Sequence, residues 1–406
     1  MELTYHAHAM AIVFFLLPLL WLPIQPERPS DIALWLLYMF SYAPTTFVCF
    51  HILQDPFPNA IYLLMAMLIA LIITDLTRRH TVKLSFHLNS PVALPLDKII
   101  FLFSIFVCIY ILYLAKFTFS IDFENIYIRR FAFTESTTLL SGYILGFGRS
   151  VVVIFFIYMA FVKKSKTALI ALFILSLGIF SCDGTKNSLF VPVFLCLICF
   201  LTIYKKSMIT LNIVLLCVIL ISIIEFVGLD SQITSTFFTR RIFAIPGYLN
   251  TAFWEYYTGH DKVMMADSIG KYFVDSSNVM APTFVIGYEY VDNIETNANT
   301  GIWMGGYAHF GFVGIILISM IAGFILGLVD NLTKTKFPLL GFLACAYIGI
   351  LWPEQMLHTS MLTGGVFYIL IFLLIYCNTS VINRTTSYFH NVLLALKNPM
   401  IEQNRK

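Results

Sequence analysis

Residues Met208 to Gly228 read M-I-T-L-N-I-V-L-L-C-V-I-L-I-S-I-I-E-F-V-G, an apolar run long enough to cross a lipid bilayer. A spanning helix needs about 20 mostly apolar residues, because lipid cannot hydrogen-bond an irregular backbone. In the whole chain 59% of residues are hydrophobic and 12% are charged. Soluble domains carry roughly a quarter charged residues. The sequence therefore predicts an all-α, polytopic transmembrane protein.

Eleven apolar runs are predicted to span the membrane, near residues 8–24, 31–54, 60–76, 97–116, 138–162, 167–182, 187–204, 208–228, 305–329, 337–353 and 359–378. The predicted organisation is eight helices in 1–227, one long external loop with short helices in 228–304, three helices in 305–378 and a cytoplasmic tail in 379–406. The first run has no basic segment before it and no small-residue cleavage site, so it is predicted to be a retained helix.

The basic residues predict the orientation, because cytoplasmic loops are enriched in Lys and Arg. Alternate loops hold sixteen and eight of the 25 basic residues, and Arg149 lies inside a predicted span. The larger set is taken as cytoplasmic, which places the 228–304 loop outside. These turns also account for the net charge of +3, so no nucleic-acid partner is expected.

The eight cysteines are scattered through the apolar runs and are interpreted as small buried hydrophobic residues. No external group of residues has the spacing of a metal site, and no D-x-D pair occurs in the external loops. We therefore expect no metal and no cofactor.

Two single cations are functional candidates, one inside a predicted span and one in a short external turn. Arg149 lies in G-Y-I-L-G-F-G-R-S (142–150), and a cation at this depth is a functional candidate, although its side chain can instead extend to the lipid headgroups. Lys186 lies in C-D-G-T-K-N-S (182–188), where the amides that begin the next helix can hold an anion. A simple exposed turn is the alternative for Lys186.

A second pair of arginines, Arg129 and Arg130, lies among aromatic residues in 121–135. Aromatic faces stack on sugars and arginines bind carboxylate or phosphate oxygens, so this segment is a candidate glycan surface. Anchoring of the aromatic residues at the membrane interface explains it equally well.

Arg240 and Arg241 give the strongest polar signal, in F-F-T-R-R-I-F-A-I-P-G (237–247). Neighbouring residues of a helix point about 100° apart, so one arginine faces a site and the other faces the headgroups, and single replacements are expected to have unequal effects. Binding of both to lipid phosphates is the alternative. The following segment from Tyr248 to Tyr257 is predicted to form an amphipathic helix on the membrane surface.

The loop ends on N-A-N-T-G-I-W-M-G-G-Y-A-H-F-G (297–311). Asn297, Asn299 and Tyr307 can hydrogen-bond sugar hydroxyls. His309 is a candidate general base near neutral pH, ahead of Glu289 and Glu255, and a structural histidine is the alternative.

Together, R-R-I-F-A-I-P-G, N-A-N-T-G, G-Y-A-H-F-G-F-V-G and the earlier D-G-T-K-N-S resemble the Wzy-type O-antigen polymerases of Gram-negative bacteria. The motifs cover about 182–314 and the topology covers most of the chain. The segment is more distantly similar to the O-antigen ligases. Those usually carry a His-Asn pair where this chain has Asn299 and its neighbours, and this difference favours polymerase over ligase.

The resemblance implies a glycosyltransferase of lipopolysaccharide biosynthesis, in the bacterial inner membrane with its active site facing the periplasm. A glycan on undecaprenyl diphosphate would be transferred to the non-reducing end of a lipid-linked repeat unit. The partners implied are the two lipid-linked oligosaccharides, the membrane lipids and, as a further candidate, a chain-length regulator. Arg240 or Arg241, with Arg149 and Lys186, would hold the diphosphate. The candidate sugar-binding residues are Asn297, Asn299, Tyr307, Tyr248, Arg129 and Arg130, and His309 is the candidate base.

Two other classes of function stay open beside the ligase. A flippase for the same lipid-linked oligosaccharide should carry polar residues through the depth of many helices. A purely structural membrane partner would not need an arginine inside a span.

Overall fold

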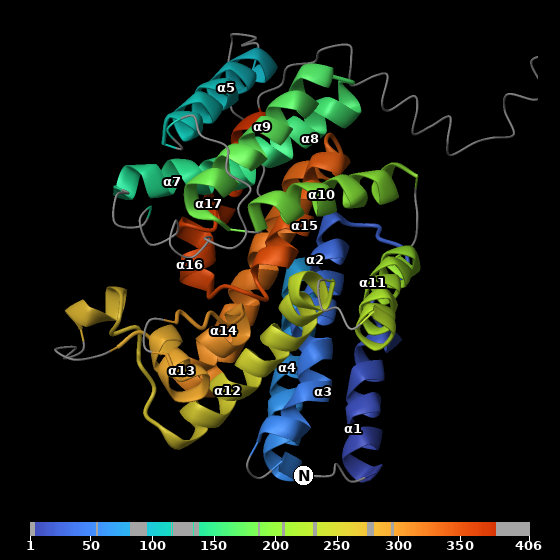
Figure 1. The fold of residues 1–406 in the computed structure, drawn as a ribbon, viewed down its shortest axis with the longest axis vertical. Coiled ribbons are helices and arrows are strands. Elements are labelled where there is room, and N and C mark those ends of the chain that lie inside the picture. The colour runs from blue at the N-terminus through green and yellow to red at the C-terminus, as the bar shows by residue number, and fades with distance from the viewer. Residues whose placement is uncertain are drawn as a thin grey trace, which may run out of the picture.

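The computed structural model describes residues 5–53, 56–81, 96–114, 116, 133, 138–185, 187–204, 208–229, 234–273, 280–293 and 296–378. Within these ranges the regular structure is helical and no strand occurs (Figure 1). The elements are α1 (Tyr5–Leu16), η1 (Leu17–Leu20), α2 (Pro29–Leu37), η2 (Tyr38–Tyr42), α3 (Ala43–Ile52), α4 (Pro56–His80), α5 (Leu96–Leu114), α7 (Leu139–Phe147), η3 (Gly148–Val152), α8 (Val153–Val162), α9 (Lys166–Asp183), α10 (Asn187–Ile203), α11 (Met208–Leu229), η4 (Ser235–Ala244), α12 (Ile245–Gly259), η5 (Ile269–Tyr272), α13 (Pro282–Val291), α14 (Ile302–Thr333), α15 (Pro338–Leu351), α16 (Leu357–Leu362) and α17 (Val366–Asn378).

Six helical stretches are long and apolar enough to cross a membrane: Pro29–Ile52, Phe57–His80, Asp97–Leu114, Leu140–Val162, Met208–Leu229 and Ile302–Thr333. Shorter apolar helices lie at the other predicted spans, over Tyr5–Leu20, Lys166–Cys182, Asn187–Ile203, Pro338–Leu351 and Val366–Cys377. The all-helical membrane architecture is confirmed, and the count of eleven spans stays a prediction.

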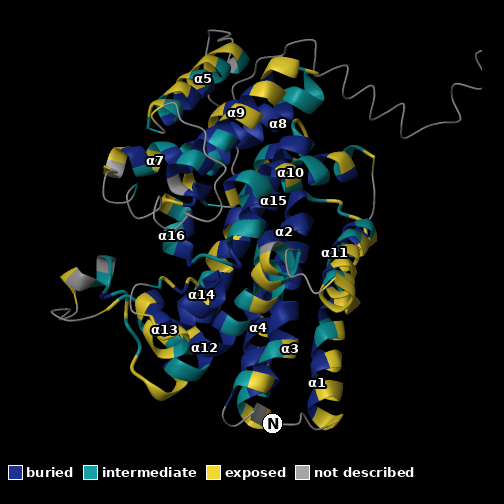
Figure 2. Ribbon diagram, viewed as in Figure 1, coloured by how far each residue is buried: buried dark blue, intermediate teal, exposed yellow. Residues whose placement is uncertain are grey.

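The helices differ in how much of their surface other helices cover (Figure 2). Every residue of α2 is buried, and α15 is buried over most of its length. In α11, by contrast, only 17% of the apolar window is buried, and Ile213, Leu220 and Ile224 are exposed. Lipid tails are as apolar as these side chains, so a peripheral helix needs no protein cover inside a bilayer.

The cysteine interpretation is confirmed for most of the eight thiols. Six are buried in the helical core, while Cys196 is half-buried and Cys217 is exposed on α11. All eight are free.

Arg78 is buried at the end of α4 and holds a polar network together. Its guanidinium lies 2.7 Å from Asp31 and 2.6 Å from Asp75, and it donates to Ser30 Oγ at 2.6 Å. Ser30 in turn donates through its backbone N–H and its hydroxyl to Asp330 of α14. The sequence interpretation placed Arg78 in a cytoplasmic loop, which is wrong, because α4 continues past residue 76 and buries the side chain.

Polar contacts join helix ends that are predicted to lie on the same side of the membrane. The Arg78 network joins the start of α2 to the ends of α4 and α14, three positions predicted on the cytoplasmic side. At the opposite side, Asn187 at the start of α10 donates to Glu354 after α15 at 2.9 Å. Which of the two sides is the cytoplasm stays a prediction.

Helix α12 is not the surface helix that its aromatic pattern predicts. Its residues from Leu249 to Trp254 are buried, and it packs between α3 and α14. Asn250 donates to Ser41 Oγ of η2 and to Thr45 Oγ1 of α3, both at 3.1 Å. Its side-chain oxygen accepts from Thr300 at 3.0 Å. A buried amide needs such partners, so the segment folds inward to supply them.

The predicted ninth span is broken at Gly311, whose backbone has φ 63° and ψ −144°. Gly306 and Gly314 would lie about 12 Å apart along a straight helix. Instead, a Cβ placed on Gly306 would lie 2.8 Å from the Gly314 carbonyl oxygen. Residues 302–310 therefore fold back against the following helix, and 312–333 alone, about 33 Å long, suffice to cross a bilayer core of roughly 30 Å.

This fold-back predicts the effect of adding one methyl group. Gly306→Ala is expected to destabilise the protein by about 1–3 kcal/mol, since the Gly314 carbonyl and Ile318 have to move. Gly142→Ala in α7 is the control, because a Cβ there meets no atom within 4 Å and alanine favours a helix. Thermal unfolding of both variants in one detergent checks this, and equal melting temperatures would show that the two glycines are not packed as described.

Candidate functional site

The candidate site is organised around the turn W-P-E-Q-M-L-H from Trp352 to His358, called here the 352–358 turn. The Trp352 carbonyl accepts from the Ile302 amide at 3.0 Å. Gly301 lies so close that a Cβ there would be 3.0 Å from the same carbonyl oxygen, and a Cβ on Gly305 would be 2.7 Å from the Met356 side chain. Small residues at the start of α14 thus let the turn dock there, with a carboxylate and an imidazole on it.

The carboxylate of the turn, Glu354, is in electrostatic reach of one of the two adjacent arginines, Arg241. It accepts a hydrogen bond from Asn187 at 2.9 Å. Burial raises the pKa of Glu354, and the nearby Arg241 and Asn187 oppose that rise. Both arginines are exposed, and Arg241 is the one in electrostatic reach of Glu354. Unequal effects of the two single replacements stay a prediction.

The pair is carried by η4, a π-helical segment in which the Ile245 amide donates to the Arg240 carbonyl. Arg149 is carried by a second π-helical segment, η3. Such wide turns inside helices are frequent at functional sites, because they re-aim side chains without ending the helix.

Arg149 is half-buried near the C-terminal ends of α9 and α15. It lies close enough to Cys182 and to Tyr347 to act electrostatically on both side chains. Tyr347 donates to the Gly364 carbonyl at 2.9 Å, and Ser150 packs against Gly365. The predicted cations Arg149 and Arg241 thus approach α15 from two elements, at Tyr347 and at Glu354.

A second polar cluster lies at the other end of the turn, around His309, Asp267 and His358. The His309 and His358 ring centroids are 5.7 Å apart, and His309 Nδ1 is 4.0 Å from Asp267 Oδ1. His309 is buried and His358 is half-buried on α16. Burial lowers the pKa of His358, and Asp267 opposes that change.

Two tyrosines that are predicted to bind sugars form contacts with other residues of the protein. Tyr307 is buried, stacks on Trp254 with 4.5 Å between ring centroids, and shares a 3.0 Å hydrogen bond with Thr258. Tyr248 is half-buried and donates to the Tyr290 carbonyl at 2.7 Å. This geometry gives both residues packing roles and leaves little of Tyr307 for a ligand.

The remaining predicted residues divide by position. Asn297 and Asn299 are exposed just before the buried Thr300, near the start of α14. Lys186, Arg129 and Arg130 lie outside the described residues.

The residues that sequence reasoning missed are Glu354, His358 and Asp267. The turn was interpreted as a short gap between two apolar runs, and Asp267 as one of several loop carboxylates. The available signal was a Glu and a His together between two predicted spans on the external side. The sequence could not show that Arg241 and Asp267, distant in sequence, come into electrostatic reach of this Glu and this His.

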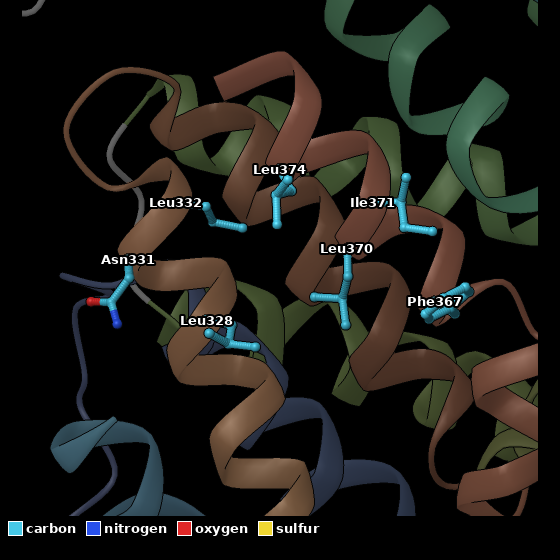
Figure 3. A pocket seen from close by; sticks show the side chains of 7 residues that line it. All are labelled: Leu328, Asn331, Leu332, Phe367, Leu370, Ile371 and Leu374. Carbon is cyan, nitrogen blue, oxygen red and sulfur yellow. The ribbon is translucent and has the colours of Figure 1, made fainter. Parts of the chain in front are cut away.

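An apolar pocket between α14 and α17 lies away from these groups (Figure 3). It is lined by Leu328, Asn331, Leu332, Phe367, Leu370, Ile371 and Leu374. With almost no polar lining it offers no chemistry, and it matches a lipid-facing crevice. In the part of the chain that the structure describes, no group of three or more His, Cys, Asp or Glu side chains is placed to hold a metal ion.

Comparisons of this chain with protein-family models, with curated proteins and with solved structures find no match.

Proposed function

We propose that the chain is a membrane glycosyltransferase that polymerises lipid-linked oligosaccharides, an O-antigen polymerase of the Wzy type. It acts at the periplasmic face of the inner membrane without a metal. The observation that carries the proposal is the approach of Arg241 and Arg149, each on a π-helical segment, to the predicted external end of α15. A partly covered site with two cations suits a diphosphate.

The proposed glycosyl transfer needs cations at the leaving group, and arginines provide them. A hydroxyl of the acceptor repeat unit forms a bond to the anomeric carbon of the donor glycan. The bond from that carbon to the diphosphate oxygen breaks, and its electron pair leaves with undecaprenyl diphosphate. Arginines that are already in place stabilise the growing negative charge, which is often the largest contribution to catalysis.

Arg241 and Arg149 are proposed to hold the diphosphate, with Lys186 as a further candidate. Glu354 is in electrostatic reach of Arg241 and is proposed to offset part of its charge before the donor binds. Asn297 and Asn299 remain candidates for sugar hydroxyls, since their side chains are exposed.

The flippase alternative receives less support. Within the described residues, the buried titratable polar side chains are those of Asp31, Asp75, Arg78, His309 and Asp330, and they lie near helix ends. A transport path for a charged lipid headgroup needs polar groups along its whole depth.

Deletion of the gene tests the proposed function and separates it from its rivals. Loss of a polymerase is expected to leave a single repeat unit on lipid A core, seen as one band where the wild type gives a ladder. Loss of a ligase would leave no repeat unit there, and loss of a flippase would trap the intermediates inside. Either of the last two patterns, or an unchanged ladder, contradicts the proposal, and the wild-type gene on a plasmid serves as the control.

A further inference from the structure

His309 is held by an unusual backbone arrangement. The carbonyls of Ala308 and His309 end the short helix before Gly311 and accept from the amides of Val263 and Met264, both at 3.0 Å. Met264 and Met265 both have positive φ, 50° and 57°, a conformation that non-glycine residues seldom adopt. It directs the Met265 amide at His309 Nδ1, at 3.3 Å.

This contact defines the protonation of the His309 ring. A backbone amide can only donate, so Nδ1 accepts and the proton of the neutral ring is on Nε2. Neither nitrogen then has a lone pair for a substrate proton. The predicted role of His309 as general base therefore conflicts with its geometry.

The same contact leaves Asp267 in need of a donor. Its side chain is 9% exposed, and Oδ1 has no hydrogen-bond partner among the described residues. The nearest imidazole atom, His309 Nδ1 at 4.0 Å, carries no proton in this arrangement. A buried carboxylate oxygen without a protein donor is available to accept a hydrogen bond from a neighbouring group that gains a proton.

His358 is the group able to supply that proton. It is half-buried, its ring is 5.7 Å from His309, and Asp267 is in electrostatic reach. Within the described part of the chain, the titratable groups that face His358 are Asp267 and His309. Asp267 lies beyond ion-pair distance of the His358 ring, and a base and its orienting acid often come into hydrogen-bond contact only when the substrate binds.

We propose that His358 is the catalytic base, that Asp267 is its positioning residue, and that His309 is a neutral structural residue behind them. The proposal rests on the proposed function. As the acceptor oxygen bonds to the anomeric carbon, its proton passes to His358. The carbon–oxygen bond to the diphosphate breaks at the same time, and Asp267 Oδ1 accepts a hydrogen bond from the resulting imidazolium. The proton later leaves to solvent.

Matched His→Asn variants test the assignment in purified protein given lipid-linked repeat units. His309→Asn keeps an oxygen that can accept from the Met265 amide, and its rate is expected within about tenfold of wild type. His358→Asn removes the base and is expected to lose about 10²–10⁴-fold. Both variants are first checked for wild-type melting temperature. The reverse order of rates, or equal rates, overturns the proposal.

Two further measurements keep the test valid if His358→Asn unfolds. His358→Gly is expected to regain activity when imidazole is added, whereas a structural role would give no rescue. The base must be neutral to act, so wild-type activity falls as pH drops through the pKa of His358. Asp267 raises that pKa, so Asp267→Asn is expected to move the acidic limb to lower pH, and an unmoved limb contradicts the role of Asp267.

The outcomes separate this role from the proposed function. A wild-type protein that forms no polymer refutes the proposed function and the role together. Wild-type polymer formation with an equally active His358→Asn variant refutes the role alone.

Discussion

Arg241→Ala is expected to slow polymerisation by about 10²–10³-fold, the range found when one group that stabilises a developing anion is removed. Arg241 is in electrostatic reach of Glu354, which follows the predicted external end of α15, and it is carried by the π-helical segment η4. Its proposed role is to stabilise the negative charge that grows as the diphosphate leaves, so its loss affects that step. The rate of polymer growth with lipid-linked repeat units measures the effect.

The neighbouring Arg240→Ala is the control for this prediction. Arg240 is on the same segment and is also exposed, but Arg241 is the arginine in electrostatic reach of Glu354. We expect Arg240→Ala to lose less than about tenfold, the size of a weakened surface contact to lipid phosphate. Arg241→Lys keeps the charge but not the planar fork, and an intermediate rate is expected. Should both alanine variants and Arg149→Ala still make long chains at wild-type rate, the arginines do not bind the diphosphate.

Arg78→Ala is expected to destabilise the protein by about 3–5 kcal/mol, the cost of leaving buried charges without their partner. The guanidinium is 1% exposed and lies within 2.7 Å of both Asp31 and Asp75. Without it, these carboxylates stay buried with one exposed cation nearby, and Ser30 loses the donor that supports its bond to Asp330. Thermal unfolding of purified protein in one detergent measures the change.

Arg79→Ala provides the matched control on the next residue. Its guanidinium also pairs with Asp75, at 2.8 Å, but its side chain is 45% exposed. Exposed ion pairs contribute about 0–1 kcal/mol, so this variant should unfold close to wild type. Equal shifts for the two variants would mean that the Arg78 network does not join the helix ends.

The membrane fold could be predicted from composition because lipid permits so few solutions. Apolar runs such as 208–228 must be helical in a bilayer, and each predicted run coincides with an apolar helix. The reversal at Gly311 could not be predicted, since a glycine in an apolar run fits close helix packing equally well. The burial of α12 was missed for a similar reason, because its aromatic pattern also suits a membrane surface.

Of the residues in the candidate site, only the arginines could be identified from the sequence. Arginines near apolar runs stand out in a sequence because their presence in a membrane needs a cause. A single carboxylate or imidazole in an external segment is common and needs no special explanation. The sequence therefore does not single out Glu354, His358 or Asp267. A role for these residues can be inferred only from the groups that the fold brings near them. The docking of the start of α14 on the 352–358 turn sets that arrangement.

The most direct test is the reaction of the purified, full-length chain with a lipid-linked repeat unit in detergent or vesicles. The proposed function predicts a ladder of longer lipid-linked glycans, with one undecaprenyl diphosphate released for each linkage formed and no metal added. An intact repeat unit after incubation, or transfer only to lipid A core, would contradict it.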